Sequence, residues 1–235
     1  MEKLLGIVGG LGPETSCSFC LNVNNGVKKV KDTQPQIIME NVPMSDKALD
    51  VIAHGGFSAE VLGLLVDSVN RLNRAGADLI VIPCNTVHVF INDLRKISDV
   101  PILSIIEETA KECKLKSFQK VGVLASSTTI KKHLYAAELQ KCKIELITPN
   151  VIDQQFVSDC IIKIINQNFT PEDKNKMIEI VEQLKNDGAQ AVILGCTDLF
   201  LILLPEDTTL PLINSTSVLE QATIKHLLSI KIEER

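Results

Sequence analysis

The sequence predicts an α/β protein of two pseudo-symmetric domains, each a parallel sheet flanked by helices, with its functional site in the cleft between them. Two observations support this fold class. Short apolar runs bounded by glycine, proline or polar residues alternate with longer segments of helical period, the pattern of parallel sheets covered by helices. In addition, residues 76–84 (GADLIVIPC) match residues 188–196 (GAQAVILGC) without a gap.

Eight apolar runs are predicted to form strands, because each is short and bounded by turn residues. They are residues 4–8, 37–40, 79–82, 102–105, 121–124, 144–147, 191–194 and 212–213. Two predicted helices, 59–75 and 171–187, each lead into one copy of the matched segment. The second begins with Thr170 and Pro171, an N-cap followed by proline at the first helical position.

The internal repeat extends beyond this match and sets the expected domain boundary. Residues 4–8 resemble residues 120–124, and residues 101–104 resemble residues 211–214, in the same order along the chain. We therefore expect one domain at residues 1–100 and a second at residues 101–206. The C-terminal segment, residues 207–235, is expected to pack back on the first domain.

Composition excludes several classes of protein. With 45% hydrophobic and 23% charged residues the chain is globular, and its net charge of -5 argues against nucleic acid as the main partner. No uninterrupted apolar run reaches the roughly 18 residues of a membrane helix, and the apolar start at residues 4–11 is too short and glycine-rich for a signal peptide. Seven cysteines without an export signal predict reduced thiols in the cytoplasm.

The two matched segments each end on a cysteine, Cys84 or Cys196. Ligands of open α/β sheets bind at the carboxyl ends of the strands, where a helix N-terminus would lower the pKa of a thiol. An unpaired cysteine is commonly a small core residue. Two cysteines at equivalent strand ends, followed by Asn85 and Thr197, instead favour two acid/base groups on opposite faces of one small molecule. Stereochemical inversion at a carbon needs that arrangement.

Three segments together resemble the aspartate/glutamate racemase family, closest to its aspartate racemase branch. They are residues 9–13 (GGLGP), 83–88 (PCNTVH) and 194–199 (LGCTDL). The resemblance spans nearly the whole chain and implies racemisation of a small acidic amino acid, aspartate first and glutamate second, without pyridoxal phosphate, metal or another cofactor. It implies that Cys84 and Cys196 are catalytic: one thiolate removes the α-proton, and the other thiol returns a proton from the opposite side.

The resemblance also implies a set of substrate-binding residues by position. The polar members are Asn85, Thr86, Thr197, Ser126, Ser127 and Thr129. The first three would bind the α-carboxylate and amino group together with helix N-terminal N–H groups, which suit anions. The other three fit a hydroxyl-rich loop of the family, although helix caps and turns have the same composition. Gly10 lies in a tight turn that would let the substrate approach the backbone.

Recognition of the distal carboxylate is where the sequence departs from the family pattern. Aspartate racemases usually have an arginine after a Pro-x-Asp element, and here Lys47 takes that place. Lysine is a point charge that cannot form the bidentate fork of arginine. Lys163 fits the second basic position of the branch. A solvated surface position explains Lys47 equally well and Lys163 somewhat better, so the sequence defines the reaction better than the substrate.

Three weaker patterns are present. Cys17 and Cys20 have the spacing of a redox pair or half a zinc site, but no second pair accompanies them, so we interpret them as core residues on one helix face. His88 lies one helical turn after Cys84 and would either orient the site or cap a helix. The glycines of residues 6–13 follow a strand as in a dinucleotide loop, but their pattern is not GxGxxG.

Other functions stay open. A related dicarboxylate isomerase or decarboxylase of the same superfamily would also use cysteines at these positions, and the lysine in place of arginine keeps it possible. A non-catalytic acidic amino-acid binding protein would keep the pocket without exchanging the α-proton, and a nicotinamide-dependent dehydrogenase is a more distant alternative. By analogy with relatives, which are often dimers, a homodimer is expected, with no nucleic acid or membrane partner.

Overall fold

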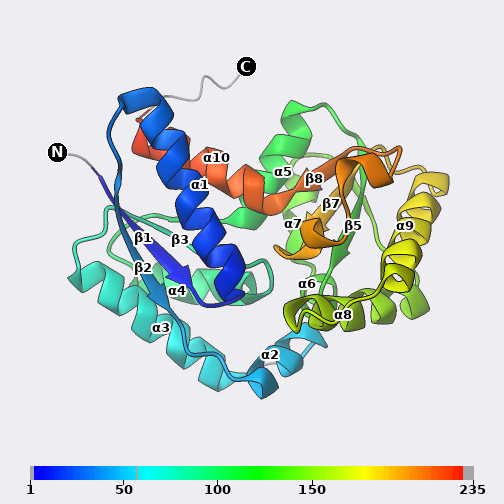
Figure 1. Ribbon diagram of the computed structural model, residues 1–235, viewed down its shortest axis with the longest axis horizontal. Helices are drawn as coiled ribbons and strands as arrows, with labels where there is room; N and C mark the ends of the chain where they lie inside the picture. Colours follow the sequence, from blue (N-terminus) through cyan, green and yellow to red (C-terminus); the bar gives the residue numbers. More distant parts are fainter. Residues whose placement is uncertain (1–2, 57, 230–235) are drawn as a thin grey trace.

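The structure is a computed structural model that describes residues 3–56 and 58–229. It contains two four-stranded parallel sheets with helices on both faces of each, which confirms the predicted fold class (Figure 1). The first sheet has the order β2-β1-β3-β4 and the second the order β6-β5-β7-β8. Each sheet therefore has the same strand order relative to its own half of the chain, as expected from the repeat.

All eight predicted strands are present, with small changes at their ends. The strands are β1 (Leu4–Gly9), β2 (Gln36–Asn41), β3 (Leu79–Val81), β4 (Ile102–Leu103), β5 (Lys120–Ala125), β6 (Glu145–Ile147), β7 (Val192–Gly195) and β8 (Leu212–Asn214). The prediction of a strand over residues 102–105 was too long. Ser104 ends the strand because its side chain accepts the Glu107 N–H and caps the next helix.

The helices occupy the segments between the strands. They are α1 (Pro13–Lys31), α2 (Asp46–Ala53), α3 (Ala59–Arg74), α4 (Ile91–Ile97), α5 (Ile105–Leu115), α6 (Ser127–Lys131), α7 (Leu134–Lys141), α8 (Val151–Ile165), α9 (Pro171–Asn186) and α10 (Ser215–Leu227), with short 3₁₀ turns η1 (Thr86–Phe90), η2 (Leu199–Leu201) and η3 (Pro205–Asp207). The predicted helices 59–75 and 171–187 are α3 and α9. Thr170 caps α9, as its sequence predicts, and the structure adds a reciprocal box with Asp173.

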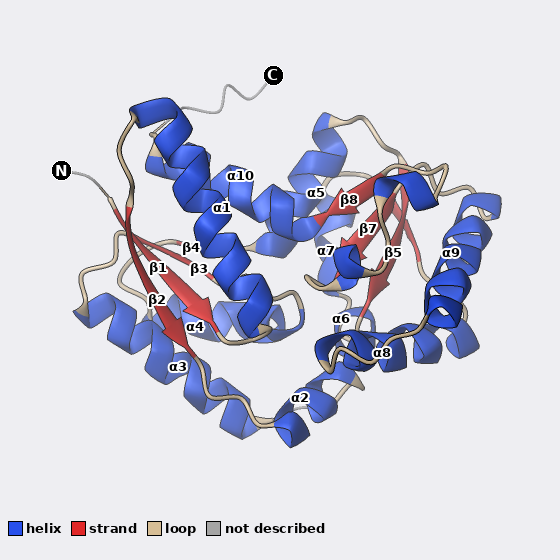
Figure 2. Cartoon of the chain, in the orientation of Figure 1, coloured by secondary structure: helices blue, strands red, loops and turns tan. Residues whose placement is uncertain are grey.

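Three apolar clusters hold the layers together. In β3, Leu79 and Val81 face a central cluster, whereas Ile80 and the following Ile82 face an outer cluster with α3 and α4, since side chains alternate along a strand. A third cluster lies between the second sheet and helices α8 and α9. The central cluster joins both halves through α1, α5, α7 and α10, which lie between the two sheets (Figure 2).

The chain crosses between the halves twice. After β4 completes the first sheet, α5 packs against α7 of the second half; after β8 completes the second sheet, α10 packs against α1 of the first half and against α5. The helices that cross begin after Ser104 and Asn214, which cap α5 and α10. The two halves therefore exchange a helix, and one continuous core connects them.

Candidate active site

A pocket between the two halves contains both cysteines. It is lined by Leu11, Ile52, Ala53, Cys84, Asn85, Thr86, Ser126, Ile161, Ile165, Cys196, Thr197 and Asp198. Its volume for the centres of water molecules is about 40 Å³, and roughly 10–15 Å³ by this measure holds one water. The pocket therefore has room for about three waters, and a thiol from each half of the duplicated fold lies in its wall.

Cys84 follows the end of β3. The Cys84 N–H donates to the Ile82 carbonyl at 2.8 Å, which turns the chain into η1, and the backbone N–H groups of Thr86 and Val87 interact with the thiol. These N–H groups favour the thiolate. Burial acts in the opposite direction and is stronger, so the pKa of Cys84 rises to about 11, with a further increase from the nearby Asp198.

Cys196 has the equivalent position after β7. The backbone N–H groups of Thr197 and Asp198 interact with its thiol, but burial and then the Asp198 carboxylate raise its pKa well above the usual value. Cys84, which lines the same pocket, adds a smaller increase through its own charge. Both thiols are partly accessible from the pocket although protein atoms surround them densely.

The prediction that helix N-termini lower the thiol pKa values was wrong for this structure. The elements that follow the cysteines, η1 and η2, are 3₁₀ turns of five and three residues. Such short turns carry little of the dipole of an α-helix, and the desolvation of a charge in a buried pocket outweighs it. Each cysteine is therefore held as a neutral thiol near neutral pH, and a thiolate needs a positive charge brought close to it.

Asp198 is the one charged residue in the pocket lining, considering the part of the chain that the structure describes. It is 7% exposed, and its carboxylate accepts a hydrogen bond from the Thr15 hydroxyl. Burial raises its pKa, the Thr15 hydrogen bond opposes this, and Glu14 adds a further increase. Sequence reasoning did not select Asp198, although its position two residues after Cys196 at a strand end could have indicated it.

Three of the predicted hydroxyl residues line the pocket, and two lie behind the lining. Thr86, Ser126 and Thr197 line the pocket, and the Thr86 and Ser126 hydroxyl oxygens are 2.9 Å apart across the two halves. Thr129 lies behind Ser126, with 3.0 Å between their hydroxyl oxygens. Ser127 instead bonds the Ser158 hydroxyl of α8 at 2.7 Å. The three lining residues can contact a ligand, whereas Ser127 and Thr129 fix the loop that carries Ser126.

Asn85 lines the pocket, and its side chain is also part of a buried network. Tyr135 donates its hydroxyl to the Asn85 Oδ1 at 2.6 Å, and the Asn85 Nδ2 donates to the Ser215 hydroxyl at 3.0 Å. Ser215 in turn donates to the Leu194 carbonyl at 2.7 Å. The network connects Asn85 to α7, α10 and β7. It therefore fixes the position of the end of β3 relative to the end of β7.

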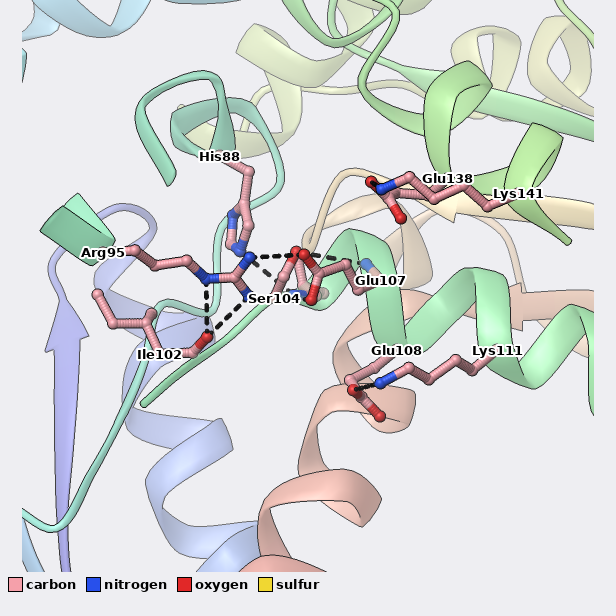
Figure 3. Close-up of polar contacts among 10 residues, drawn as sticks. His88, Arg95, Ile102, Ser104, Glu107, Glu108, Lys111, Glu138 and Lys141 are labelled. Carbon is pink, nitrogen blue, oxygen red and sulfur yellow. Dashed lines mark hydrogen bonds and ion pairs between the residues drawn. The ribbon is translucent and has the colours of Figure 1, made fainter. Parts of the chain in front are cut away.

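His88 supports Cys84 from behind. Its Nε2 accepts the Ile105 N–H at 3.2 Å, so the ring proton lies on Nδ1, which donates to the Cys84 carbonyl at 2.7 Å. Burial lowers the pKa of His88 to about 4, and the ring is therefore neutral. Arg95 lies beside it and forms two hydrogen bonds to Glu107 at 2.6 and 2.9 Å (Figure 3). The ring joins the Cys84 backbone to the start of α5.

The two predicted lysines and Gly10 lie outside the pocket lining. Lys163 forms an ion pair with Asp173 of α9, with 2.6 Å between Nζ and Oδ1, and Lys47 is exposed on α2. Gly10 has a φ of 83°, and a Cβ there would lie 2.6 Å from backbone atoms of Val42. Glycine is therefore required at this position for the close approach of the chain after β1 and β2.

The remaining patterns have structural explanations. Cys20 packs against the central core, but Cys17 is exposed, so the prediction that both are core residues was wrong for Cys17. All seven cysteines are free thiols, and within residues 3–56 and 58–229 no cluster of three or more His, Cys, Asp or Glu side chains could hold a metal ion. No helix in the described ranges is long and apolar enough to cross a membrane.

Comparison with known proteins identifies close similarity in sequence and fold. The profile described as Asp/Glu/Hydantoin racemase matches residues 8–223. The broad specificity amino-acid racemase RacX of Bacillus subtilis is 27% identical over 231 residues, which cover 96% of this chain and 99% of that protein. The aspartate racemase of Picrophilus torridus has the same fold, with a TM-score of 0.79 at 21% identity over 96% of this chain and 94% of that one.

A glutamate racemase from Francisella tularensis, solved in complex with D-glutamate, is similar in fold as well. Its TM-score is 0.70 at 18% identity, over 97% of this chain and 82% of that chain. At these identities the two solved structures establish the fold alone. That fold is the duplicated α/β arrangement described above.

Proposed function

Because the chain belongs to the Asp/Glu/Hydantoin racemase family, we propose that it is an amino-acid racemase whose two bases are Cys84 and Cys196. The single observation that carries this proposal is that thiols from equivalent strand ends of the two halves line the same small pocket. Groups on opposite walls can remove a proton from one face of a carbon and return a proton to the other.

The proton transfers balance within the pair. One cysteine, as thiolate, takes the α-proton and becomes a thiol, which leaves a carbanion delocalised into the α-carboxylate. The other cysteine, as thiol, donates its proton to the opposite face and becomes the thiolate. The first sulfur has gained one proton and the second has lost one. The cysteine pair that results is therefore in the protonation state that the reverse reaction needs.

The other polar residues of the pocket fit this chemistry. We assign the α-ammonium group to the Asp198 carboxylate and the α-carboxylate to the hydroxyls of Thr86, Ser126 and Thr197. A cation beside the thiols would lower their pKa values, since an opposite charge favours the thiolate. The substrate itself would thus supply the positive charge that the buried cysteines lack. Ser127 and Thr129 act on the Ser126 loop as positioning residues.

The expectation of aspartate first and glutamate second stays a prediction, as do the roles of Lys47, Lys163 and Gly10. The cytoplasmic location and the homodimer also stay predictions. Size-exclusion chromatography with light scattering measures the oligomeric state. A panel of amino acids assayed by chiral chromatography measures the substrate.

Incubation with L-amino acids in deuterium oxide tests the function. A racemase must introduce deuterium at the α-carbon and form the D-enantiomer, whereas a binding protein would only be stabilised by its ligand. Positioned acid/base groups contribute roughly 100- to 10,000-fold each, so Cys84→Ser and Cys196→Ser should each lose at least about 100-fold in turnover. Cys113→Ser, at a buried cysteine of α5 away from the pocket lining, is the matched control. Near-normal turnover in either pocket variant would refute the two-base assignment.

A further inference from the structure

We infer that the side-chain subsite of this racemase takes an uncharged, largely apolar amino-acid side chain rather than an acidic one. The inference rests on the proposed function and narrows its substrate class. It follows from what the pocket lining contains, and from where the basic residues near the pocket lie.

One wall of the pocket is apolar. Ile161 and Ile165 are four residues apart on α8 and so lie on one face of that helix. Ile52 and Ala53, at the end of α2, and Leu11, after β1, complete the wall. Among the residues that the structure describes, no lysine, arginine or histidine lines the pocket. A carboxylate placed against this wall would be desolvated without a cation to pair with it.

Lys47 and Lys163, the lysines expected to recognise a distal carboxylate, do not line this pocket. Lys47 lies in the first turn of α2 and is exposed. Lys163 is two residues from both Ile161 and Ile165, which rotates it about 200° from each around the helix axis. Its ammonium group pairs with Asp173 of α9 instead. Lys131, on α6 near the end of α2, donates to the His54 carbonyl on the surface. None of these ammonium groups lines the space beside the isoleucines.

The polar groups of the pocket lie at its reacting end. Asp198 lies two residues after Cys196 and lines the same pocket as both thiols, and the hydroxyls of Thr86 and Ser126 are in contact with each other. In the proposed binding mode these groups hold the ammonium and carboxylate of the α-carbon. The apolar wall is what remains for the side chain. A second carboxylate would also be repelled by Asp198.

The first test is a substrate panel with the full chain. The rate of α-deuterium incorporation, as kcat/KM, is measured for L-alanine, L-valine, L-leucine, L-aspartate, L-glutamate and L-lysine. We expect the best uncharged substrate to exceed both acidic ones by at least about tenfold, as a buried polar group without a partner discriminates strongly.

The second test places a cation in the wall. In Ile165→Lys, at a half-buried position of α8, the ratio of kcat/KM for aspartate to that for leucine should rise at least about tenfold. The matched control is Ile152→Lys, the same substitution at an 82% exposed position of the same helix, which should leave the ratio unchanged. If circular dichroism shows that Ile165→Lys is unfolded, Ile165→Thr replaces it and should reduce kcat/KM for leucine more than for aspartate.

The outcomes separate this inference from the proposed function. Faster exchange of aspartate or glutamate than of every uncharged substrate would overturn the inference and leave the racemase assignment intact. Fastest exchange of lysine would also overturn it, and would assign Asp198 to the side chain. Exchange with none of the six amino acids would remove the proposed function itself. A ratio that moves equally in Ile165→Lys and Ile152→Lys would show that the apolar wall does not select the substrate.

Discussion

Removal of one hydroxyl, by Tyr135→Phe, should weaken the connection between the two halves at the active site. Tyr135 is 1% exposed and donates its hydroxyl to Asn85 of the other half at 2.6 Å. The Asn85 side chain is equally buried and passes the connection on to Ser215. Phenylalanine keeps the ring and its packing, so the variant removes only the hydroxyl, with its bond to Asn85 and its contacts with Thr109 and Ser215.

The expected loss of stability follows from the burial of the Asn85 side chain. A buried acceptor that loses its donor costs about 1–3 kcal/mol, and in chains of this length each kcal/mol lowers Tm by about 2–4 °C. We therefore expect Tm to fall by about 2–12 °C. Because Asn85 follows Cys84 directly, the sulfur should also lose its fixed position, and a displacement of about 1 Å reduces turnover by up to about 100-fold.

Thermal unfolding and α-deuterium exchange measure the two effects. The matched control is Thr223→Val, which removes a fully buried hydroxyl that donates to the Leu219 carbonyl within α10, at 2.7 Å. Its loss leaves no group of the other half unpaired, so the change in Tm should be small and turnover normal. If Tyr135→Phe has the same Tm and the same turnover as this control, the network does not connect the halves.

Three further predictions concern titrating groups. His88→Gln should reduce kcat by the same factor from about pH 5.5 to 8, because burial holds the pKa of His88 at about 4; a factor that changes across this range would contradict a positioning role. Burial lowers the pKa of His54, but hydrogen bonds to Asp159 and Asp50 raise it more, so the net shift is upward from 6.5. The stabilisation that protonated His54 gains from these aspartates is therefore present below pH 6.5 and is lost as pH rises through the higher folded pKa. Because the His54–Asp159 contact connects the end of α2 to α8, and both helices line the pocket, KM should increase with pH in the wild type more than in His54→Ala. The pKa of Cys84 rises from 9.0 to about 11, so unfolding measurements should show stability falling between about pH 9 and 11, less steeply in Cys84→Ser.

The fold was predictable because its signals are local. Each strand is a short apolar run between turn residues, and α9 is marked by Thr170, Pro171 and Asp173 within four positions. The meeting of Cys84 and Cys196 in one pocket was predictable for a related reason. Duplicated parallel sheets place equivalent strand ends at equivalent edges, and the sequence match identified which ends these are.

The groups that sequence reasoning missed depend on packing between distant segments. Tyr135 is 50 positions from Asn85, and Ser215 is 130 positions from it. No periodicity or local motif connects such residues. The rotation of α8 about its axis, which decides that Ile161 and not Lys163 faces the pocket, is likewise set by how that helix packs on the second sheet. Burial has the same origin, so the direction of the thiol pKa shifts could not be predicted from flanking residues.

The two sides of the pocket are held by different kinds of contact. On one side the apolar core through α1, α5, α7 and α10 joins the halves and fixes the relative positions of the cysteines. On the other side α2 contacts the second half by polar groups: the Thr128 hydroxyl and the Lys131 ammonium donate to carbonyls of Ile52 and His54. The Lys131 contact is exposed and contributes little. The Thr128 hydroxyl is buried, and a single hydrogen bond of this kind contributes about 1 kcal/mol.

A molecule that enters the pocket should therefore displace α2, which carries two lining residues, Ile52 and Ala53, while the thiols stay in place. Hydrogen exchange measures this directly, because amide protection reports local opening. We expect amides of α2 to exchange faster than those of α5 and α10, and a substrate to slow exchange in α2 more than in the core helices. Equal slowing throughout α2, α5 and α10 would mean that the halves move as whole bodies, and that the continuous core does not fix the two sulfur atoms.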